Sequence, residues 1–151
     1  MGRLALIGVP GSGKSAVGRA LARALDVPFV DVADELGGPG AVVDSGEDEA
    51  TRLAERIAAA ADVDAVIAMP SWCTHGPQSA RTVYLVANAA ESFARSGMNI
   101  AGPVGLVNPR SMWALLLRER DPEYRAAADL VIDVSGKSIS EVSGEVLAHL
   151  R

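Results

Sequence analysis

The stretch GVPGSGKS, from Gly8 to Ser15, fulfils the pattern G-x-x-x-x-G-K-[ST] at every position. It follows the short apolar run RLALIG of residues 3–8 and precedes KSAVGRALARAL, residues 14–25, in which apolar side chains recur at helical spacing. The sequence therefore places a glycine-rich loop between a buried strand and a helix. This is the context in which such a loop binds phosphate groups, and we interpret the stretch as a P-loop, or Walker A motif.

The residue types of this loop indicate how it holds a nucleotide. Glycines permit backbone turns that direct successive N–H groups at phosphate oxygens, and the first turn of the helix adds its own free N–H groups. Lys14 is expected to be the catalytic cation for the β- and γ-phosphates, and the Ser15 hydroxyl a ligand of Mg²⁺. The predicted nucleotide-binding residues are Gly8, Gly11, Ser12, Gly13, Lys14, Ser15 and Ala16.

Composition excludes several other classes of protein. The chain has 151 residues, 49% of them hydrophobic, which is enough for the core of one domain. Its formal net charge of -5 provides no basic field for nucleic acid, so no nucleic-acid partner is expected. The apolar run near the start is too short for a membrane span, and the single cysteine, Cys73, permits no internal disulfide. We expect a cytoplasmic protein with no membrane partner, and either a monomer or a weak homodimer.

Strand and helix patterns alternate along the rest of the chain. Short apolar runs indicate further strands at residues 28–32, 64–69, 82–87 and 129–134. Apolar residues at helical spacing indicate helices at residues 47–61, 109–118 and 138–150. Ser138 and Glu141 form a capping box at the start of the last helix. This alternation predicts an α/β fold in a single domain, residues 1–151, with a parallel sheet between helices. We interpret the glycine-rich segment 95–113 as a mobile lid.

Two longer segments are similar to a known family. GVPGSGKSAVGRALARALDVPFVDVADEL, residues 8–36, resembles the N-terminal part of shikimate kinases, and LLLRERDPEYRAAADLVIDVSGKSISEVSGEVLAHL, residues 115–150, resembles their C-terminal part. The resemblance implies a three-layer P-loop kinase fold whose five-stranded parallel sheet has the order 2-3-1-4-5. It also implies that ATP and Mg²⁺ serve to phosphorylate a hydroxyl group of a small acceptor, either shikimate or a similar hydroxylated carboxylic acid.

Asp31 and Asp34 follow the predicted second strand, whose carboxyl end faces the P-loop in a fold of this class. Two carboxylates at this edge can have separate roles: one holds the metal, and the other orients the acceptor hydroxyl or accepts its proton. We assign Asp31, with Ser15, to the metal, and Asp34 to the acceptor as a catalytic residue. In the alternative, Asp34 only caps a helix. The spacing of the two residues also differs from the D-x-D pattern of the family.

Three arginines are candidates for the acceptor side. Arg52, with Glu55, falls where the family has an F-R-x-x-E pattern, and its guanidinium fork fits a carboxylate, although the same residue can equally be solvated. Arg120 corresponds to the family's second substrate arginine and precedes DPEY, where we expect Pro122 to start a new helix. Arg110 is the candidate for a catalytic lid arginine, or else a surface residue at a helix start.

The chain departs from the family in VIAMPSWCTHG, residues 66–76, where shikimate kinases have three consecutive glycines. Proline removes a backbone donor and Trp72 fills space, so Trp72 either stacks on the acceptor or blocks the pocket. His75 is a further candidate for an acid or base. Three functions therefore stay open: a shikimate kinase with substituted contacts, a kinase for a gluconate-like or nucleotide acceptor, or a nucleotide-binding protein without transferase activity.

Overall fold

The chain folds around one parallel sheet. The computed structural model describes residues 2–35, 47–96 and 109–150. Its strands are β1 (Arg3–Ile7), β2 (Phe29–Asp31), β3 (Ala65–Ala68), β4 (Ala80–Val86) and β5 (Leu130–Asp133). They lie in the order β2-β3-β1-β4-β5, and every neighbouring pair is parallel. The α/β fold class and the sheet order 2-3-1-4-5 are therefore confirmed.

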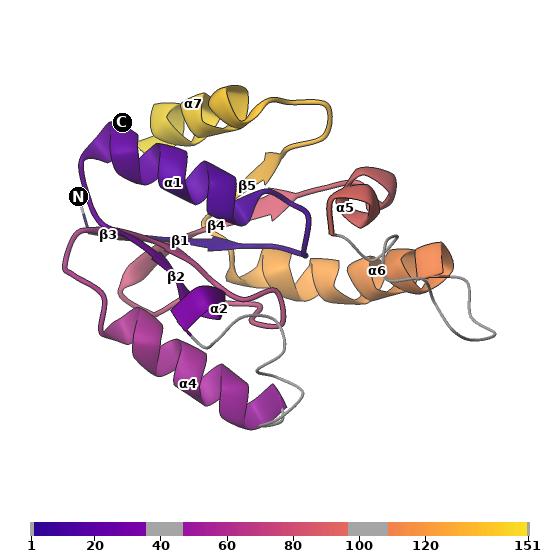
Figure 1. Cartoon of the computed structure of the whole chain (residues 1–151), viewed down its shortest axis with the longest axis horizontal. Helices are drawn as coiled ribbons and strands as arrows, with labels where there is room; N and C mark the ends of the chain where they lie inside the picture. The colour runs from indigo at the N-terminus through magenta and orange to yellow at the C-terminus, as the bar shows by residue number, and fades with distance from the viewer. Residues whose placement is uncertain (1, 36–46, 97–108, 151) are drawn as a thin grey trace.

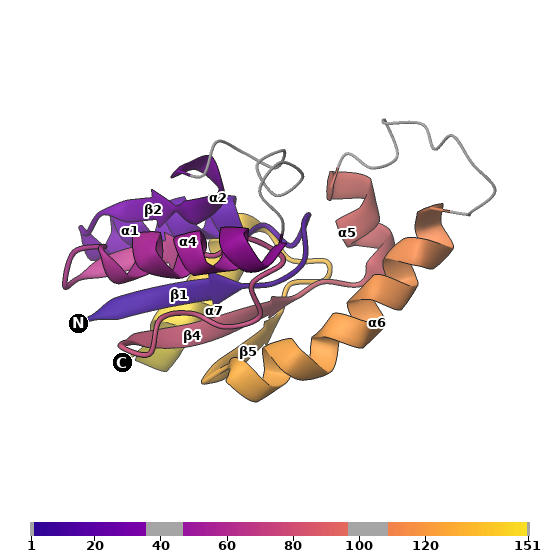
Figure 2. The same ribbon diagram turned by 90° about the horizontal axis from the view of Figure 1, so that it is seen from below.

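Helices cover both faces of this sheet (Figure 1). They are α1 (Lys14–Leu25), α2 (Val32–Glu35), α4 (Glu47–Ala59), α5 (Ala89–Ser96), α6 (Pro109–Ala127) and α7 (Ile139–Leu150). α1 and α7 lie together on one face, whereas α4 and α6 cover the other, as the second view in Figure 2 also shows. α5 packs against α6. No helix in the described ranges is long and apolar enough to cross a membrane.

The central strand β1 is buried on both faces. Ala5 and Ile7 pack into the hydrophobic cluster beneath α4 and α6, while Leu4 and Leu6 pack into the cluster beneath α1 and α7. Successive side chains of a strand point to opposite faces, which is why an almost continuous apolar run is needed here. This burial holds the end of β1, and with it the P-loop, in a fixed place.

The starts of two helices follow the sequence signals. α1 begins after Gly13, whose φ of 89° lies in the left-handed region that favours glycine. At the start of α7, the Ser138 N–H donates to Glu141 Oε1 at 3.3 Å, and the Glu141 N–H donates to Ser138 Oγ at 3.1 Å. The predicted capping box is therefore confirmed.

Helix α6 is longer than the sequence patterns predict. The expectation that a helix ends near residue 118 and a new one starts at Pro122 is wrong, because α6 runs through Pro122 without a break. Asp121 accepts hydrogen bonds from the Tyr84 hydroxyl and from Arg125 Nε, each at 2.7 Å. Tyr124 stacks on Tyr84 with 4.8 Å between the ring centroids. These contacts to β4 hold the segment as helix despite the missing proline N–H.

Candidate active site

The P-loop forms one wall of a pocket. Gly11 and Gly13 have φ angles of 81° and 89°, in the region that favours glycine. A Cβ atom at Gly11 would also collide with the carbonyl group of Ser92 in α5, so the loop needs glycine there for space as well as for conformation. These two glycines therefore set the path of the loop that the sequence pattern predicts.

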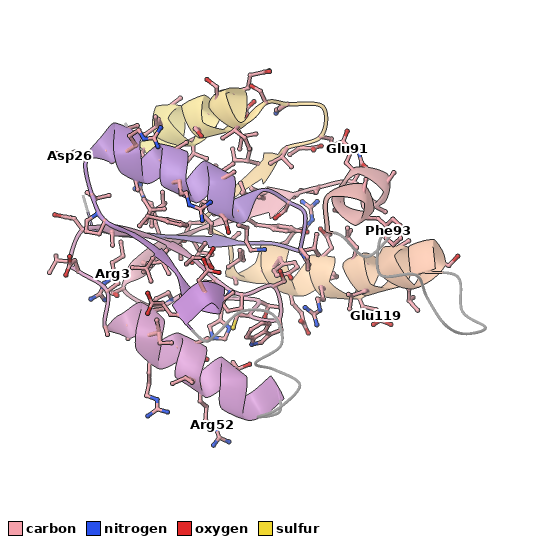
Figure 3. The ribbon with its side chains drawn as sticks, viewed as in Figure 1. Arg3, Asp26, Arg52, Glu91, Phe93 and Glu119 are labelled. Carbon is pink, nitrogen blue, oxygen red and sulfur yellow. The ribbon has the colours of Figure 1, made fainter. Side chains whose placement is uncertain are left out.

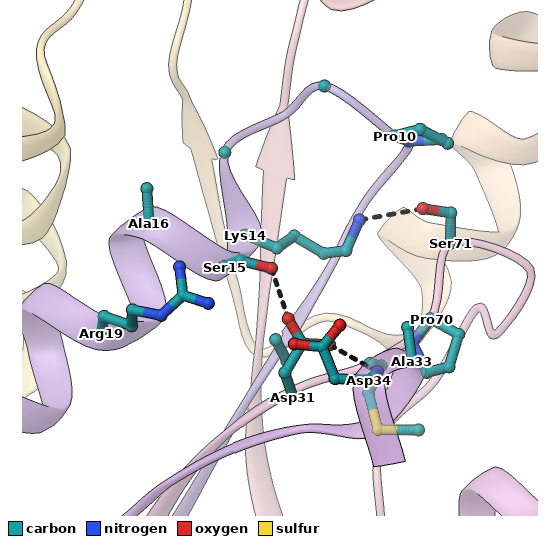
Figure 4. Close-up of a pocket in the computed structure, with 14 residues that line it drawn as sticks. Pro10, Lys14, Ser15, Ala16, Arg19, Asp31, Ala33, Asp34, Pro70 and Ser71 are labelled. Carbon is teal, nitrogen blue, oxygen red and sulfur yellow. Dashed lines mark hydrogen bonds between the residues drawn. The ribbon is translucent and has the colours of Figure 1, made fainter. Parts of the chain in front are cut away.

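The pocket has a volume of about 470 Å³ and joins segments that are far apart in the sequence (Figure 4). Its walls are the P-loop with the start of α1, the end of β2 with α2, and the segment that follows β3. From the predicted loop residues it takes Gly11 and residues 13–16, and from the predicted carboxylates it takes both Asp31 and Asp34. The structure thus brings both carboxylates to the predicted phosphate loop.

Two predicted loop residues lie outside the lining of this pocket. Gly8 presents its carbonyl oxygen to Lys14, and a Cβ atom on Gly8 would stand 2.9 Å from the carbonyl oxygen of Leu85. Ser12 is buried: its N–H donates to Val9 O at 3.2 Å, and its hydroxyl has no hydrogen-bond partner among the described residues. Both residues therefore contribute to the conformation of the loop without lining the pocket.

Lys14 is a cationic side chain of the pocket lining, as is Arg19. Its Nζ donates to Gly8 O at 2.7 Å, to Val9 O at 3.2 Å and to Ser71 Oγ at 3.0 Å. Burial lowers the pKa of Lys14 to about 8, although the nearby Asp31 carboxylate acts in the opposite direction. The lysine is therefore protonated near neutral pH and loses its proton in mildly alkaline solution.

Ser15 and Asp31 form a pair of oxygen ligands beside the lysine. Ser15 Oγ donates to Asp31 Oδ2 at 2.6 Å, so a hydroxyl and a carboxylate lie together in the pocket. Both are hard ligands of the kind that Mg²⁺ prefers, and Mg²⁺ often takes only one or two protein ligands beside phosphate oxygens and water. The pair therefore fits the magnesium site that the sequence predicts for these residues.

Asp34 lies on the short helix α2, three residues after Asp31. Its side chain is exposed and lines the pocket. The residue that caps this helix is Asp31, since Asp31 Oδ1 accepts a hydrogen bond from the Asp34 N–H at 3.4 Å. The structure therefore does not show Asp34 as a cap, and the Asp34 carboxylate faces the pocket.

The segment after β3 is held in place by α6. Ser71 O accepts hydrogen bonds from Arg120 Nη1 at 2.8 Å and from the Tyr124 hydroxyl. Burial raises the pKa of Tyr124, so its hydroxyl stays protonated and remains a donor near neutral pH. Ser71 lines the pocket, whereas Arg120 is not part of the lining and contacts it through the Ser71 carbonyl.

Like Arg120, two further residues predicted for the acceptor are not part of the pocket lining. Arg52 is exposed on α4 and points outward from the molecule (Figure 3). The inward face of this helix instead carries Ala54 and Ala58, which are fully buried. Trp72 is half-buried and packs against the core cluster beneath α4 and α6. The lining of the pocket therefore includes neither Arg52 nor Trp72, and their roles toward the acceptor stay predictions.

The predicted lid, residues 95–113, lies largely outside the described residues. Residues 97–108 and the side chain of Arg110 belong to the part of the chain that is not described. The lid and the catalytic role of Arg110 therefore stay predictions. His75 is described, and its Nε2 lies 3.0 Å from Glu55 Oε1 on α4, in an exposed pair that is not part of the pocket lining.

Two polar side chains of the pocket lining, those of Arg19 and Ser71, are absent from the predicted site. Arg19 lines the pocket one helical turn beyond Ser15, with its guanidinium carbon 5.5 Å from the ring centroid of Phe29. The spacing of Arg19 from Ser15 on one helix was a usable signal, because residues four apart share a face. Ser71 reaches Lys14 across 57 positions of the chain, and no local pattern signals such a contact.

Comparisons with known proteins agree on one family. No protein-family model matches the chain. A shikimate kinase of Mycobacterium avium (strain 104) is 34% identical to it over 161 residues, which cover 96% of this chain and 91% of the relative. Identity at this level over nearly the whole length of both chains shows common membership of a family.

Solved structures share the fold. A shikimate kinase from Acinetobacter baumannii in complex with shikimate has a TM-score of 0.76 at 20% identity, over 99% of this chain and 93% of that chain. A gluconokinase from Sinorhizobium meliloti 1021 has a TM-score of 0.67 at 23% identity, over 99% of this chain and 91% of that chain. Together with the relative from Mycobacterium, the P-loop and the sheet order, these findings lead to one conclusion. The chain belongs to the shikimate kinase family of P-loop phosphotransferases.

Proposed function

We propose that the protein uses ATP with Mg²⁺ to phosphorylate a hydroxyl group of a small acceptor, and that shikimate is the first acceptor to test. One observation carries this proposal: a single pocket of about 470 Å³ holds Lys14 of the P-loop, the Ser15–Asp31 pair and the Asp34 carboxylate. Membership of the family supports the reaction class. Cys73 is the single cysteine of the sequence, so no internal disulfide can form, which suits a reducing cytoplasm.

The P-loop binds the triphosphate by charge and by backbone donors. Lys14 supplies a cation whose present acceptors are two loop carbonyls and one hydroxyl, all of which phosphate oxygens can displace. The first N–H of α1 that donates to a carbonyl of the preceding turn is that of Val17. The N–H groups of residues 14–16 come before it in the helix. They are available to phosphate at the positive end of the helix dipole. Ser15 and Asp31 hold Mg²⁺, which when bound neutralises charge on the phosphates.

Asp34 serves the acceptor side of the reaction. Its exposed carboxylate lines the same pocket as Lys14, whereas Asp31 already accepts hydrogen bonds from Ser15 and from the start of α2. A carboxylate within hydrogen-bond reach of the acceptor hydroxyl orients that hydroxyl and accepts its proton as the oxygen attacks phosphorus. We therefore assign Asp34 to the acceptor and Asp31 to the metal.

Arg120 and the lid complete the acceptor side. Arg120 uses one guanidinium N–H to hold the Ser71 carbonyl, and the guanidinium has further donors for a carboxylate of the acceptor. We also assign Arg110 and the lid of residues 95–113 to this side, where closure excludes water during transfer. Arg52 is not part of the proposed site because of its outward position on α4.

A second candidate is phosphoryl transfer to a different hydroxylated acceptor, such as a gluconate-like acid or a nucleotide. The observation that favours it is the pocket wall at residues 69–71, where shikimate kinases have glycines. Pro70 offers no backbone N–H, and Ser71 adds a hydroxyl that a glycine lacks. A wall of different hydrogen-bonding groups selects a different acceptor.

The test is ADP release from ATP and Mg²⁺ with shikimate, gluconate, other cyclic polyols or nucleoside monophosphates, each added singly, with the product identified by mass spectrometry. Stimulation by shikimate supports the first proposal, and stimulation by another member of the panel supports the second. ATP binding without any acceptor-dependent turnover would contradict transferase activity and favour a nucleotide-binding protein. Lys14→Ala is the control, since turnover by a contaminating kinase would survive that substitution.

A further inference from the structure

The hydroxyl of Ser71 connects the P-loop to the opposite wall of the pocket (Figure 4). Lys14 Nζ donates to Ser71 Oγ at 3.0 Å, across 57 positions of sequence. The other two acceptors of this ammonium group, Gly8 O at 2.7 Å and Val9 O at 3.2 Å, belong to the P-loop itself. Ser71 is thus the point at which the acceptor wall touches the phosphate-binding cation.

The backbone that carries Ser71 is held from several directions. The Ser71 carbonyl accepts hydrogen bonds from Arg120 Nη1 at 2.8 Å and from the Tyr124 hydroxyl. One residue earlier, Pro70 O accepts a hydrogen bond from the Cys73 N–H at 2.9 Å, which closes a turn. Tyr124 and Cys73 are both buried. The fold therefore sets the position of the Ser71 hydroxyl in the pocket.

The contacts of Lys14 oppose nucleotide binding. An ammonium group has three N–H donors, and the acceptors on Gly8, Val9 and Ser71 engage all of them. A phosphate oxygen can bind the lysine only by displacing at least one of these acceptors. When Ser71 Oγ is displaced, its hydroxyl faces the pocket with its donor and lone pairs available.

We propose that Ser71 is a positioning residue that couples the two sides of the site. It restrains Lys14 while the pocket is empty, and it binds the acceptor once a nucleotide has drawn the lysine away. The acceptor part rests on the proposed function, whereas the lysine part requires only that the P-loop binds a nucleotide. Acceptors recognised in this way carry a second oxygen, as hydroxyl or carboxylate, near the hydroxyl that is phosphorylated.

Calorimetric binding of ATP with Mg²⁺, without any acceptor, tests the restraint on Lys14. Ser71→Ala should lower the dissociation constant about three- to tenfold, because the empty state loses a hydrogen bond to a charged donor. Ser71→Gly should act in the same direction and serves if the alanine variant fails to fold. Ser71→Thr keeps a hydroxyl and should stay near the wild type. Unchanged or weaker binding by the hydroxyl-free variants overturns the proposal.

Ser79→Ala is the matched control in the same connection between β3 and β4. Ser79 Oγ accepts a hydrogen bond from Arg3 Nη1 at 2.7 Å, at the opposite end of β1 from the P-loop. The substitution removes a hydroxyl and a hydrogen bond but leaves the contacts of Lys14 in place, so ATP affinity should not change. An equal gain in affinity for Ser79→Ala would indicate a general loosening of the connection and would overturn the assignment.

Steady-state kinetics at saturating ATP test the acceptor part, with the best acceptor of the wild-type protein. Ser71→Ala should raise KM for the acceptor about tenfold while kcat stays within about twofold. A merely structural role would instead weaken ATP binding and lower kcat together, and an unchanged acceptor KM overturns this part. If the wild-type protein phosphorylates nothing in the panel, the proposed function fails, while the binding comparison still decides whether Ser71 restrains Lys14.

Discussion

The nucleotide side and the acceptor side of the pocket are built in different ways. The nucleotide side comes from one continuous stretch, residues 8–19, joined by Asp31 at the end of the next strand. The acceptor side is assembled from α2, the segment after β3 and, behind it, α6. Its hydrogen bonds join distant residues, since Arg120 and Tyr124 lie 49 and 53 positions from Ser71.

This difference indicates that phosphate chemistry and acceptor choice can change separately. The P-loop keeps every residue of its pattern, whereas the wall at residues 69–71 has proline and serine, in the segment where the resemblance to the family leads us to expect glycines. A substitution in that wall leaves the local backbone of the P-loop intact. The two sides meet at the contact between Lys14 and Ser71. The most informative experiments therefore substitute residues of one side at a time.

The largest effect should come from removing the cation of the nucleotide side. Lys14→Ala should lower kcat/KM for ATP by at least about a thousandfold, because the charge that builds up on the phosphates loses its main protein counterpart. The melting temperature should stay close to that of the wild type, since burying an ammonium group is itself unfavourable. ADP release and thermal melting measure the two quantities.

Lys137→Ala is the control for this experiment. Lys137 is the other lysine of the chain and pairs with Glu145 at 2.7 Å on α7. Its removal should leave turnover unchanged. Normal turnover in Lys14→Ala would contradict the division of the pocket into a nucleotide side and an acceptor side, because nucleotide turnover would then not depend on the P-loop cation.

The fold and the nucleotide side were predictable because their signals are local. Each of the five apolar runs forms a strand, and the pattern from Gly8 to Ser15 lies between strand and helix as its spacing requires. The order of the strands came only through the resemblance to a family. Pairings such as Arg3 with Ala65 join distant segments, and no short pattern encodes them.

The acceptor side was less predictable because tertiary contacts decide it. Arg52 matches a family pattern, yet α4 turns Ala54 and Ala58 inward and leaves the arginine outside. Pro122 is a local helix breaker, yet the bond from Tyr84 to Asp121 keeps α6 continuous. In both cases a contact between separate segments overrides a local signal.

Substitution of the two carboxylates should distinguish the acceptor side from the nucleotide side, with effects on the rate that are smaller than that of Lys14→Ala but still large. Asp34→Asn should lower kcat about a hundredfold while ATP affinity stays within about threefold, because only the group that we propose to take the acceptor proton is lost. Asp31→Asn should instead raise the Mg²⁺ concentration needed for half-maximal rate about tenfold, since it removes the negative charge of the proposed metal ligand. Rates at varied Mg²⁺ and ATP concentrations give both values. Equal Mg²⁺ dependence in the two variants would contradict the division of roles.

Two arginines test whether position in the fold matters more than position in the sequence pattern. Arg120→Ala should raise KM for the acceptor about ten- to thirtyfold and KM for ATP by less than about threefold. The reason is that the Ser71 carbonyl, in the pocket wall at residues 69–71, loses the hydrogen bond from the Arg120 guanidinium. Arg52→Ala should leave both constants unchanged, since the side chain lies outside the pocket. A large rise of the acceptor KM in Arg52→Ala would mean that α4 turns toward the pocket when the acceptor binds.

The smallest expected effect concerns the pH dependence of nucleotide binding. Burial lowers the pKa of Lys14 to about 8, and only the protonated lysine attracts phosphate. The dissociation constant of ATP should therefore be constant below about pH 7.5 and rise about tenfold by about pH 9, because the free protein must regain a proton to bind. Lys14→Arg keeps its charge over this range and should bind with constant affinity. If the rise persists in Lys14→Arg, another group titrates; if the wild-type profile is flat, the half-buried Lys14 keeps its proton and the Ser71 contact restrains a permanent cation.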